Sequence, residues 1–373
     1  MKNKFFEEIN NNFGFGCMRL PMIGNEVDLE ETKKMVDEFI KEGFNYFDTA
    51  HGYIGGKSEL AIKECLTKRY PRDKFILTNK LTDCYFNNND DIWKVFYEQL
   101  EACGVDYFDF YLMHAMNRNN FYHYKNNGAY DTLLELKKEG KIRHIGMSFH
   151  DTSDVLDNIL NEFPEIEVVQ IQLNYLDYYD QTVQSKACYD VCVKHNKSCI
   201  IMEPVKGGIL ANVPEKAQKI FYDLNNGTPA SYAIRFAASH SNVMMVLSGM
   251  SNLNQMCDNL SYMKDFKPLN DKENEAIQKV VDVFKSRNSI QCTNCRYCVE
   301  GCPQNILIPD IFAARNSKDL YNEWTAKFYY NAVITTNNGK ASDCIKCGHC
   351  ERKCPQKLEI RKLLEEISRE FDN

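Results

Sequence analysis

Short apolar segments alternate with longer amphipathic stretches from Asn45 to about Phe266. The short segments have the length and composition of buried strands, and the longer ones repeat apolar residues at helical spacing. This alternation is typical of βα units around a parallel sheet, and its regularity over about 250 residues predicts an α/β fold, a (β/α)8 TIM barrel. The expected strands are Asn45–Asp48, Phe75–Lys80, Phe108–His114, Ile142–Ser148, Val168–Leu173, Ile200–Glu203 and Val243–Ser248, with a weak eighth near Met263–Phe266.

Helical patterns lie between these strands. Asp28, followed three residues later by Glu31, predicts a capping box at the start of the first helix. The expected barrel helices are Glu30–Lys41, Ser58–Lys68, Asp91–Cys103, Ala129–Glu139 and Val183–Lys194.

The pattern changes in the last quarter of the chain, which predicts a barrel domain over 1–285 and a small domain over 286–373. A helix expected at Asn274–Lys285 leads to this boundary. Within the tail, Pro309–Val333 is helical in pattern and rich in aromatic residues, and we expect it to pack over the tail's own core or against the barrel. Leu358–Phe371 predicts an amphipathic helix that packs locally.

Composition narrows the class of protein. The 373 residues are 44% hydrophobic and 26% charged, which is ordinary for a soluble globular chain. A net charge of −7 without a basic cluster argues against a nucleic-acid partner. The N-terminus lacks the apolar core of a signal peptide, and no stretch approaches the roughly 18 consecutive apolar residues that span a bilayer. We therefore expect a cytoplasmic protein with no membrane association.

Eight of the 16 cysteines lie in two runs near the C-terminus, each spaced CxxCxxCxxxCP. Three such thiolates bind three corners of an iron–sulfur cube, and the fourth cysteine, before the proline, reaches the other cube. The runs resemble those of bacterial two-cluster ferredoxins and predict a ferredoxin-like α+β domain with two [4Fe–4S] clusters. Structural zinc, which usually uses two CxxC pairs, fits this spacing poorly. One cluster is expected on Cys292, Cys295, Cys298 and Cys354, and the other on Cys344, Cys347, Cys350 and Cys302.

Polar residues occur at the ends of the first three expected strands, where barrel active sites form. Asp48 ends the first strand and Tyr53 follows in its loop, while Lys80 ends the second strand and His114 the third. An ammonium group next to a tyrosine lowers the pKa of the phenol, and a carboxylate holds the lysine in place. We therefore expect Tyr53 to exchange a proton with a substrate that His114 orients.

The segments Phe47–Tyr53 and Tyr111–His114, with the lysine between them, resemble the aldo/keto reductase family and its Asp–Tyr–Lys–His tetrad. Phe15–Pro21 and Ile145–Ser148 are also similar to that family. The resemblance covers most of the barrel region, and the whole layout resembles the subgroup with a ferredoxin-like C-terminal domain. It implies hydride transfer between a nicotinamide cofactor and a carbonyl or alcohol carbon, with the tyrosine as proton donor or acceptor.

The same resemblance implies the cofactor contacts. Phe149 replaces the family's usual Asn beside the nicotinamide carboxamide, and Met202 falls where many members place a stacking Tyr. The loop near the adenine end lacks the Lys and Arg that grip a 2′-phosphate, so NADPH is less supported than NADH. The expected cofactor-binding residues are Gly16, Met18, Arg19, Ser148, Gln170, Met202, Ser248, Gly249, Gln255 and Asn259.

Two functions follow from these motifs. The first is an oxidoreductase acting on a small carbonyl or alcohol compound, whose clusters exchange electrons with a ferredoxin- or flavoprotein-type partner or stabilise a docked domain. The second is an iron–sulfur electron-transfer protein whose barrel is a scaffold or holds another redox cofactor such as flavin. Hydride transfer moves two electrons at once, whereas each cluster moves one. The first function therefore needs a step that converts between the two, and this requirement separates the two functions. The intact tetrad favours the enzyme.

Overall fold

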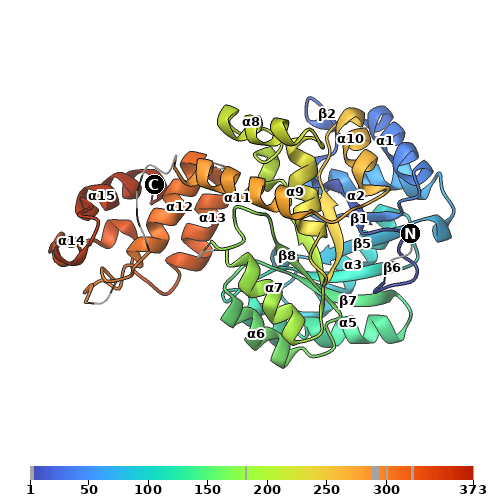
Figure 1. Cartoon of the computed structure of the whole chain (residues 1–373). Coiled ribbons are helices and arrows are strands. Elements are labelled where there is room, and N and C mark those ends of the chain that lie inside the picture. Colours follow the sequence, from blue (N-terminus) through green and yellow to red (C-terminus); the bar gives the residue numbers. More distant parts are fainter. Residues whose placement is uncertain are drawn as a thin grey trace.

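The computed structural model describes residues 4–180, 183–286, 290, 292, 294–299, 301–320 and 323–372. Eight parallel strands close into a barrel, and the last part of the chain forms a smaller helical domain beside one end of it (Figure 1). The strands follow one another around the barrel in chain order, which confirms the (β/α)8 fold. They are β1 (Phe13–Gly16), β4 (Tyr46–Asp48), β5 (Ile76–Leu81), β6 (Phe108–Met116), β7 (Ile142–Phe149), β8 (Val168–Gln172), β9 (Ser198–Met202) and β10 (Val243–Ser248).

The strand expected near Met263–Phe266 is wrong. Met263 is the last residue of helix α10 (Leu253–Met263), where it continues a buried stripe at helical spacing with Met256 and Leu260. The eighth strand is instead β1, which pairs with β4 on one side and β10 on the other and so closes the barrel. Its four residues, FGFG, are too few to show a strand period in the sequence.

Helices surround the barrel, and their apolar faces pack against the strands. A short antiparallel pair, β2 (Met22–Ile23) and β3 (Glu26–Val27), precedes the first helix. The barrel helices are α1 (Leu29–Lys41), α2 (Lys57–Ile62), α3 (Asn89–Cys103), α4 (Phe121–Asn126), α5 (Ala129–Lys138), α6 (Ser153–Glu162), α7 (Ser185–Lys194), α8 (Glu215–Leu224), α9 (Pro229–Ala238), α10 and α11 (Asp271–Lys285).

The start of α1 differs in one detail from the expected capping box. The Asp28 side chain accepts hydrogen bonds from the backbone N–H groups of Glu30 and Glu31, as an N-cap does. The Glu31 carboxylate does not return to the cap; it accepts the backbone N–H of Leu253, at the start of α10, at 3.0 Å. This contact joins two helices that lie 222 residues apart in the chain.

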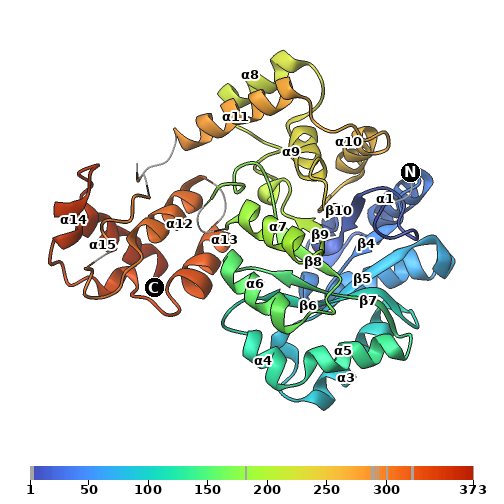
Figure 2. The same cartoon turned by 60° about the horizontal axis from the view of Figure 1, so that its bottom comes forward.

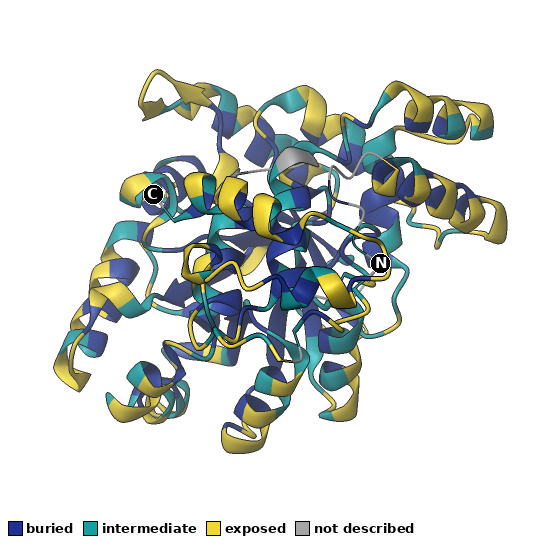
Figure 3. Cartoon of the chain, turned by 90° about the vertical axis from the view of Figure 1, so that its left-hand side faces the viewer, coloured by how far each residue is buried: buried dark blue, intermediate teal, exposed yellow. Residues whose placement is uncertain are grey.

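Buried residues concentrate in the strands and on the inner faces of the helices, while the outer helix faces are exposed (Figure 3). Along β6, alternate side chains point into and out of the barrel, so Phe110 and Leu112 fill its interior with Tyr46 and Ile200 from other strands. No helix among the described residues is long and apolar enough to cross a bilayer.

The tail is built mainly from helices. α12 (Ile308–Leu320) is followed by α13 (Glu323–Tyr329), which continues as a π-helical turn at Tyr330–Ile334, and then by α14 (His349–Lys353) and α15 (Ile360–Phe371). As expected, α15 packs locally: Ile360, Leu364, Ile367 and Phe371 are buried in the tail's own core. Among the described tail residues, β pairing is limited to one bridge between Ile306 and Gly339.

Candidate active site and cysteine cavities

The four tetrad residues converge at the C-terminal end of the barrel strands. Asp48 is the last residue of β4, and Lys80 and His114 lie near the ends of β5 and β6. Tyr53 starts a tight turn after β4, in which the following residues adopt left-handed backbone conformations. Because the strands are parallel and in register, these side chains meet at one rim of the barrel.

Lys80 is the centre of this group. Its ammonium donates to the carboxylate of Asp48 at 2.6 Å, the carbonyl oxygen of Thr49 at 2.8 Å and the hydroxyl of Tyr53 at 3.2 Å. The side chain is fully buried. Its three donors are therefore all used, which is the condition for keeping an ammonium group away from water.

Burial sets the protonation of the pair formed by Lys80 and Tyr53. Burial by itself lowers the pKa of Lys80, but the Asp48 carboxylate and the Tyr53 oxygen outweigh it, so the pKa is raised and the amine stays charged. For Tyr53, burial raises the pKa above 10 and the Lys80 charge offsets only part of that rise. As the sequence predicts, Lys80 lowers the pKa of Tyr53, but burial raises this pKa by more, so the net change is upward. Tyr53 keeps its proton at neutral pH.

His114 is held as a neutral imidazole. Burial lowers its pKa well below 6.5, and the nearby Lys80 and His150 lower it further. Its Nδ1 shares a hydrogen bond of 2.7 Å with the hydroxyl of Thr82, and its ring meets the Tyr53 ring edge-on at 5.8 Å. Among the described residues, Nε2 has no hydrogen-bond partner, which leaves it open to a substrate oxygen.

A buried polar network behind the tetrad was missed by the sequence reasoning. Glu59, which is 1% exposed, accepts a hydrogen bond from Asn79 at 2.7 Å and lies 2.8 Å from a ring nitrogen of His51. Asn79 directly precedes Lys80, and His51 is two residues before Tyr53. The network therefore ties together the two segments that carry the lysine and the tyrosine. An acidic residue on the buried face of α2 was its signal in the sequence.

Two residues expected at the nicotinamide carboxamide lie on adjacent strands, β7 and β8, where Ser148 pairs with Gln170. Gln170 is 3% exposed and its Oε1 has no hydrogen-bond partner, which is uncommon for a buried amide. The Ser148 hydroxyl accepts the backbone N–H of Ala115 at 2.6 Å and keeps its own proton to donate. This unused hydrogen-bonding capacity fits a carboxamide. Met202 ends the neighbouring strand β9 and is only partly buried.

The residues expected at the adenine end form a turn between β10 and α10. The Ser248 hydroxyl donates to Asn259 at 2.9 Å, and Gln255 accepts the backbone N–H of Ser251 at 2.8 Å, so these two amides hold the turn. Arg19 is exposed and passes over Gly249, where an added Cβ would lie 3.2 Å from its side chain. Gly16 lies against the Ser248 carbonyl, and Met18 is largely exposed next to Arg19.

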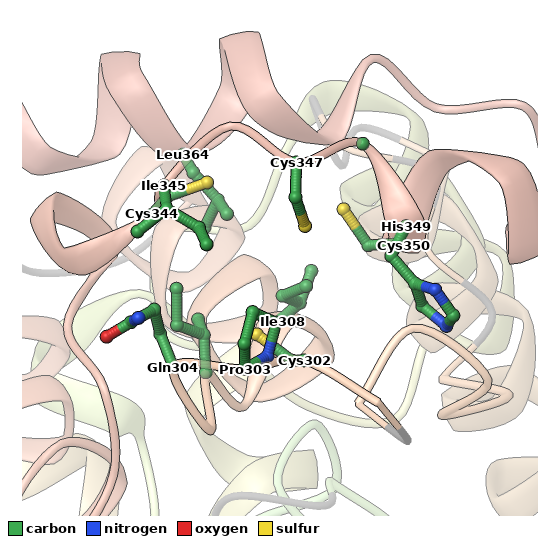
Figure 4. A pocket seen from close by; sticks show the side chains of 12 residues that line it. Cys302, Pro303, Gln304, Ile308, Cys344, Ile345, Cys347, His349, Cys350 and Leu364 are labelled. Carbon is green, nitrogen blue, oxygen red and sulfur yellow. The ribbon is translucent and has the colours of Figure 1, made fainter.

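The cysteines of the tail line two separate cavities. In one, the sulfurs of Cys302, Cys344, Cys347 and Cys350 face a common space (Figure 4). The second cavity is lined by Cys292, Cys295, Cys298 and Cys354. Each set joins three cysteines of one run to the fourth cysteine of the other, as the spacing predicts.

The two cavities are alike in size. Including their open sides, they enclose about 330 and about 320 Å³. In each cavity the cysteine side chains surround a common volume. Within the described ranges, no group of three His, Cys, Asp or Glu side chains is arranged to hold a single metal ion. Four sulfurs around such a volume suit the corners of a [4Fe–4S] cube. His349 also lines the first cavity and packs against Gly301.

Comparison with known proteins matches two family models. Residues 12–282 match the aldo/keto reductase family, and residues 291–358 match a 4Fe-4S dicluster domain. The chain is 23% identical over 311 residues to the uncharacterized oxidoreductase YqkF of Bacillus subtilis, a match that spans 74% of this chain and 95% of that protein. It is 26% identical over 212 residues to the NADH-specific methylglyoxal reductase of Escherichia coli, with 49% of this chain and 62% of that protein covered.

Solved structures give the same fold. The holo form of aldo-keto reductase AKR11C1 from Bacillus halodurans superposes with a TM-score of 0.60 at 23% identity, covering 72% of this chain and 91% of that one. An aldo-keto reductase from Klebsiella pneumoniae in complex with NADPH gives a TM-score of 0.59 at 18% identity, covering 72% and 90%.

Removing the carboxylate beside the buried ammonium is expected to destabilise the barrel. We expect Asp48→Asn to lower the free energy of unfolding by about 3–5 kcal/mol, because the buried Lys80 would lose its counterion. The double variant Asp48→Asn/Lys80→Met is expected to regain part of this loss. Urea unfolding midpoints measure both effects, and Asp73→Asn, at an exposed position, is the matched control. Equal unfolding midpoints for Asp48→Asn and the control would contradict the role of Asp48 as the stabilising counterion of Lys80.

Cysteine substitutions are expected to show which residues share a cluster. The anaerobic protein is expected to hold about eight iron and eight sulfide, and Cys354→Ser or Cys295→Ser to retain about four of each. Because both residues line one cavity, the double variant Cys295→Ser/Cys354→Ser should also retain about four, whereas Cys347→Ser/Cys354→Ser should lose nearly all. Iron and sulfide analysis decides between these patterns. An iron content for the first double variant as low as for the second would reject the crossed arrangement.

Proposed function

Because the chain belongs to the aldo/keto reductase family and carries a 4Fe-4S dicluster domain, we propose that it transfers a hydride between a nicotinamide cofactor and a small carbonyl or alcohol compound, with two [4Fe–4S] clusters that carry single electrons. The observation that carries the enzyme assignment is the contact of the Lys80 ammonium with both Asp48 and Tyr53 beside a neutral His114. Other members of the family are oxidoreductases, which agrees with this assignment.

The residues of the site have distinct roles in this reaction. Tyr53 is protonated at neutral pH, so it donates its proton to the carbonyl oxygen as negative charge develops there. Lys80 stabilises the phenolate that remains, and Asp48 keeps the ammonium in place. Neutral His114 contributes a hydrogen bond to the same oxygen without competing for the proton. In the reverse direction the phenolate accepts a proton from an alcohol.

A nicotinamide ring, when bound, supplies or accepts the hydride. The unpartnered Oε1 of Gln170 and the free proton of the Ser148 hydroxyl support a carboxamide beside the paired residues of β7 and β8, where its amide nitrogen and oxygen would satisfy them. Arg19, exposed above Gly249, is placed to contact a pyrophosphate. A cofactor held by Gln170, Ser148 and Arg19 would have its nicotinamide ring next to the barrel rim that carries the tetrad.

The charge near the start of α10 supports NADH over NADPH. The Glu31 carboxylate occupies the backbone N–H of Leu253, and the turn from Ser248 to Gln255 has no Lys or Arg. A 2′-phosphate at this helix start would meet a negative side chain in the place where it needs a positive one. Lys34, 3.5 Å from Glu31, offsets part of that charge.

The tail supports electron transfer at the protein surface. Cys295 and Cys347 are exposed, while Cys298, Cys350 and Cys354 are buried, so one side of each cavity faces outward. A cluster with one corner near the surface can pass single electrons to a ferredoxin- or flavoprotein-type carrier. This arrangement also fits the alternative function, in which the barrel is only a scaffold, and catalysis at Tyr53 separates the two.

Removing the tyrosine hydroxyl is expected to stop carbonyl turnover and leave the clusters intact. Tyr53→Phe should lower kcat with NADH by roughly 10²–10⁴-fold, because the substrate oxygen loses the hydroxyl proposed to protonate it. Iron content should stay at the wild-type value. Tyr222→Phe, at a largely exposed tyrosine, is the matched control. Unchanged carbonyl turnover in Tyr53→Phe would reject Tyr53 as the proton donor, whereas no carbonyl turnover in the wild-type protein would favour the scaffold function.

The cofactor preference is expected to depend on Glu31. Titration of the anaerobic protein should give a lower Kd for NADH than for NADPH. Glu31→Gln removes the negative charge at α10, so the ratio of the two Kd values should narrow by several-fold. Glu30→Gln, on the exposed side of the same helix turn, should leave the ratio unchanged. Tighter binding of NADPH than of NADH by the wild-type protein would refute the preference.

A further inference from the structure

Thr82, the first residue after β5, contacts the side of the His114 ring that faces away from the open nitrogen Nε2. Its hydroxyl oxygen lies 2.7 Å from Nδ1 of the imidazole. Thr82 itself is partly buried. Over the described ranges of the chain, its hydroxyl has no second hydrogen-bond partner. The contact is therefore specific to the one imidazole that stands next to the substrate oxygen in the proposed reaction.

A buried tyrosine holds the two strand ends on one side of this contact. The Tyr124 hydroxyl lies 2.9 Å from the carbonyl oxygen of Leu81 and 2.8 Å from that of His114, and it shares its proton between them. Tyr124 has no exposed surface and comes from α4, which lies close to the end of β6 (Figure 2). It therefore ties the residue before Thr82 to His114.

A buried asparagine holds the chain on the other side. The side-chain nitrogen of Asn120 donates to the Asp83 carboxylate at 3.0 Å and to the Ala115 carbonyl at 3.1 Å. Asp83 follows Thr82, and Ala115 follows His114. The contact between hydroxyl and imidazole thus has a bridge on each side. Because these bridges already fix the backbone, the hydroxyl is not needed to hold the two segments together.

The hydroxyl can decide which ring nitrogen of His114 carries the proton. Burial keeps this imidazole neutral, so one nitrogen donates a hydrogen bond and the other accepts one. If Thr82 donates to Nδ1, the ring proton is on Nε2; if Thr82 accepts from Nδ1, Nε2 presents a lone pair. A carbonyl oxygen only accepts hydrogen bonds, so the first tautomer stabilises it and the second repels it.

The tetrad provides a second donor for the same oxygen. The Tyr53 hydroxyl accepts from the Lys80 ammonium at 3.2 Å, so its own proton is left for the substrate. Its ring meets the His114 ring edge-on at 5.8 Å. An oxygen between these two rings is bound from both sides only if Nε2 also carries a proton.

We propose that Thr82 is a positioning residue, which donates its hydroxyl proton to Nδ1 of His114 and so holds the ring in the tautomer that carries its proton on Nε2. This inference rests on the proposed function and adds to it the group that makes His114 a donor. The Thr82 proton is not transferred, and Tyr53 remains the group that protonates the carbonyl oxygen. Tyr124 and Asn120 keep the hydroxyl within reach of the ring.

One test removes the hydroxyl without changing the shape of the side chain. In the full-length anaerobic protein with NADH and methylglyoxal as the carbonyl probe, Thr82→Val is expected to lower kcat about three- to tenfold, the effect of one hydrogen bond on the tautomer. The KM for NADH should not change, because the imidazole acts on the substrate oxygen. Thr82→Ser keeps a hydroxyl and should restore kcat.

The matched control is Thr67→Val, which removes a partly buried hydroxyl that donates to the Cys103 carbonyl at 2.7 Å, outside the site. Its kcat should equal that of the wild type. A Thr82→Val variant as active as this control would overturn the proposal. So would a Thr82→Ser variant that loses as much activity as Thr82→Val, because the loss would then not follow the hydroxyl.

A second measurement does not depend on turnover. NMR of protein with isotope-labelled histidine, without a nicotinamide cofactor, distinguishes a protonated from an unprotonated ring nitrogen, and the His114 signals are those lost in His114→Gln. The wild type and Thr82→Ser should carry the proton on Nε2, and Thr82→Val should show both tautomers. A wild-type proton on Nδ1 would overturn the proposal. Methylglyoxal turnover retained in Tyr53→Phe would instead refute the proposed function, and the NMR signals of His114 would still decide the role of Thr82.

Discussion

Lys80 carries its positive charge inside the rim of the barrel, with no exposed surface. Withdrawing an ammonium group from water costs several kcal/mol, and the cost is offset only where good acceptors surround it. Here the acceptors are the Asp48 carboxylate, the Thr49 carbonyl and the Tyr53 hydroxyl, all supplied by β4 and the loop that follows it. The position of Tyr53 therefore follows from the requirement to satisfy the lysine. The contact that stabilises this rim is also the contact that positions the Tyr53 hydroxyl.

The same burial determines the protonation of the neighbouring groups. It raises the pKa of Tyr53 and lowers that of His114, so both are neutral beside the charged pair of Lys80 and Asp48. A neutral phenol and a neutral imidazole around one oxygen site suit the protonation of a carbonyl. Behind them, the buried Glu59 links the segments of the tyrosine and the lysine through hydrogen bonds with the partly buried His51 and the buried Asn79. The rim is thus held from the core side as well as at the site.

The tail is a 4Fe-4S dicluster domain, and among the described residues its α13 and π-helical segment packs against the barrel. α13 and its π-helical turn contribute side chains to the core that contains the cysteines and to the contact with the barrel rim. A change in the packing around the clusters would therefore reach the mouth of the barrel through Tyr329 and Phe328. Among the described residues, this junction is where the core that contains the cysteines and the barrel rim share a segment.

The sequence by itself determined the barrel class, the family, seven of the eight strands and the two sets of cysteines that line the cavities. These follow from local patterns: apolar runs, helical spacing, and motifs whose residues lie within a few positions of one another. β1 was missed because four residues carry no period. The net pKa of Tyr53, the contact of Glu31 with α10 and the docking of α13 on the barrel were decided only by the tertiary structure. Each of these three features depends on burial or on the approach of segments far apart in the chain. Local sequence patterns predict neither burial at a particular atom nor such an approach.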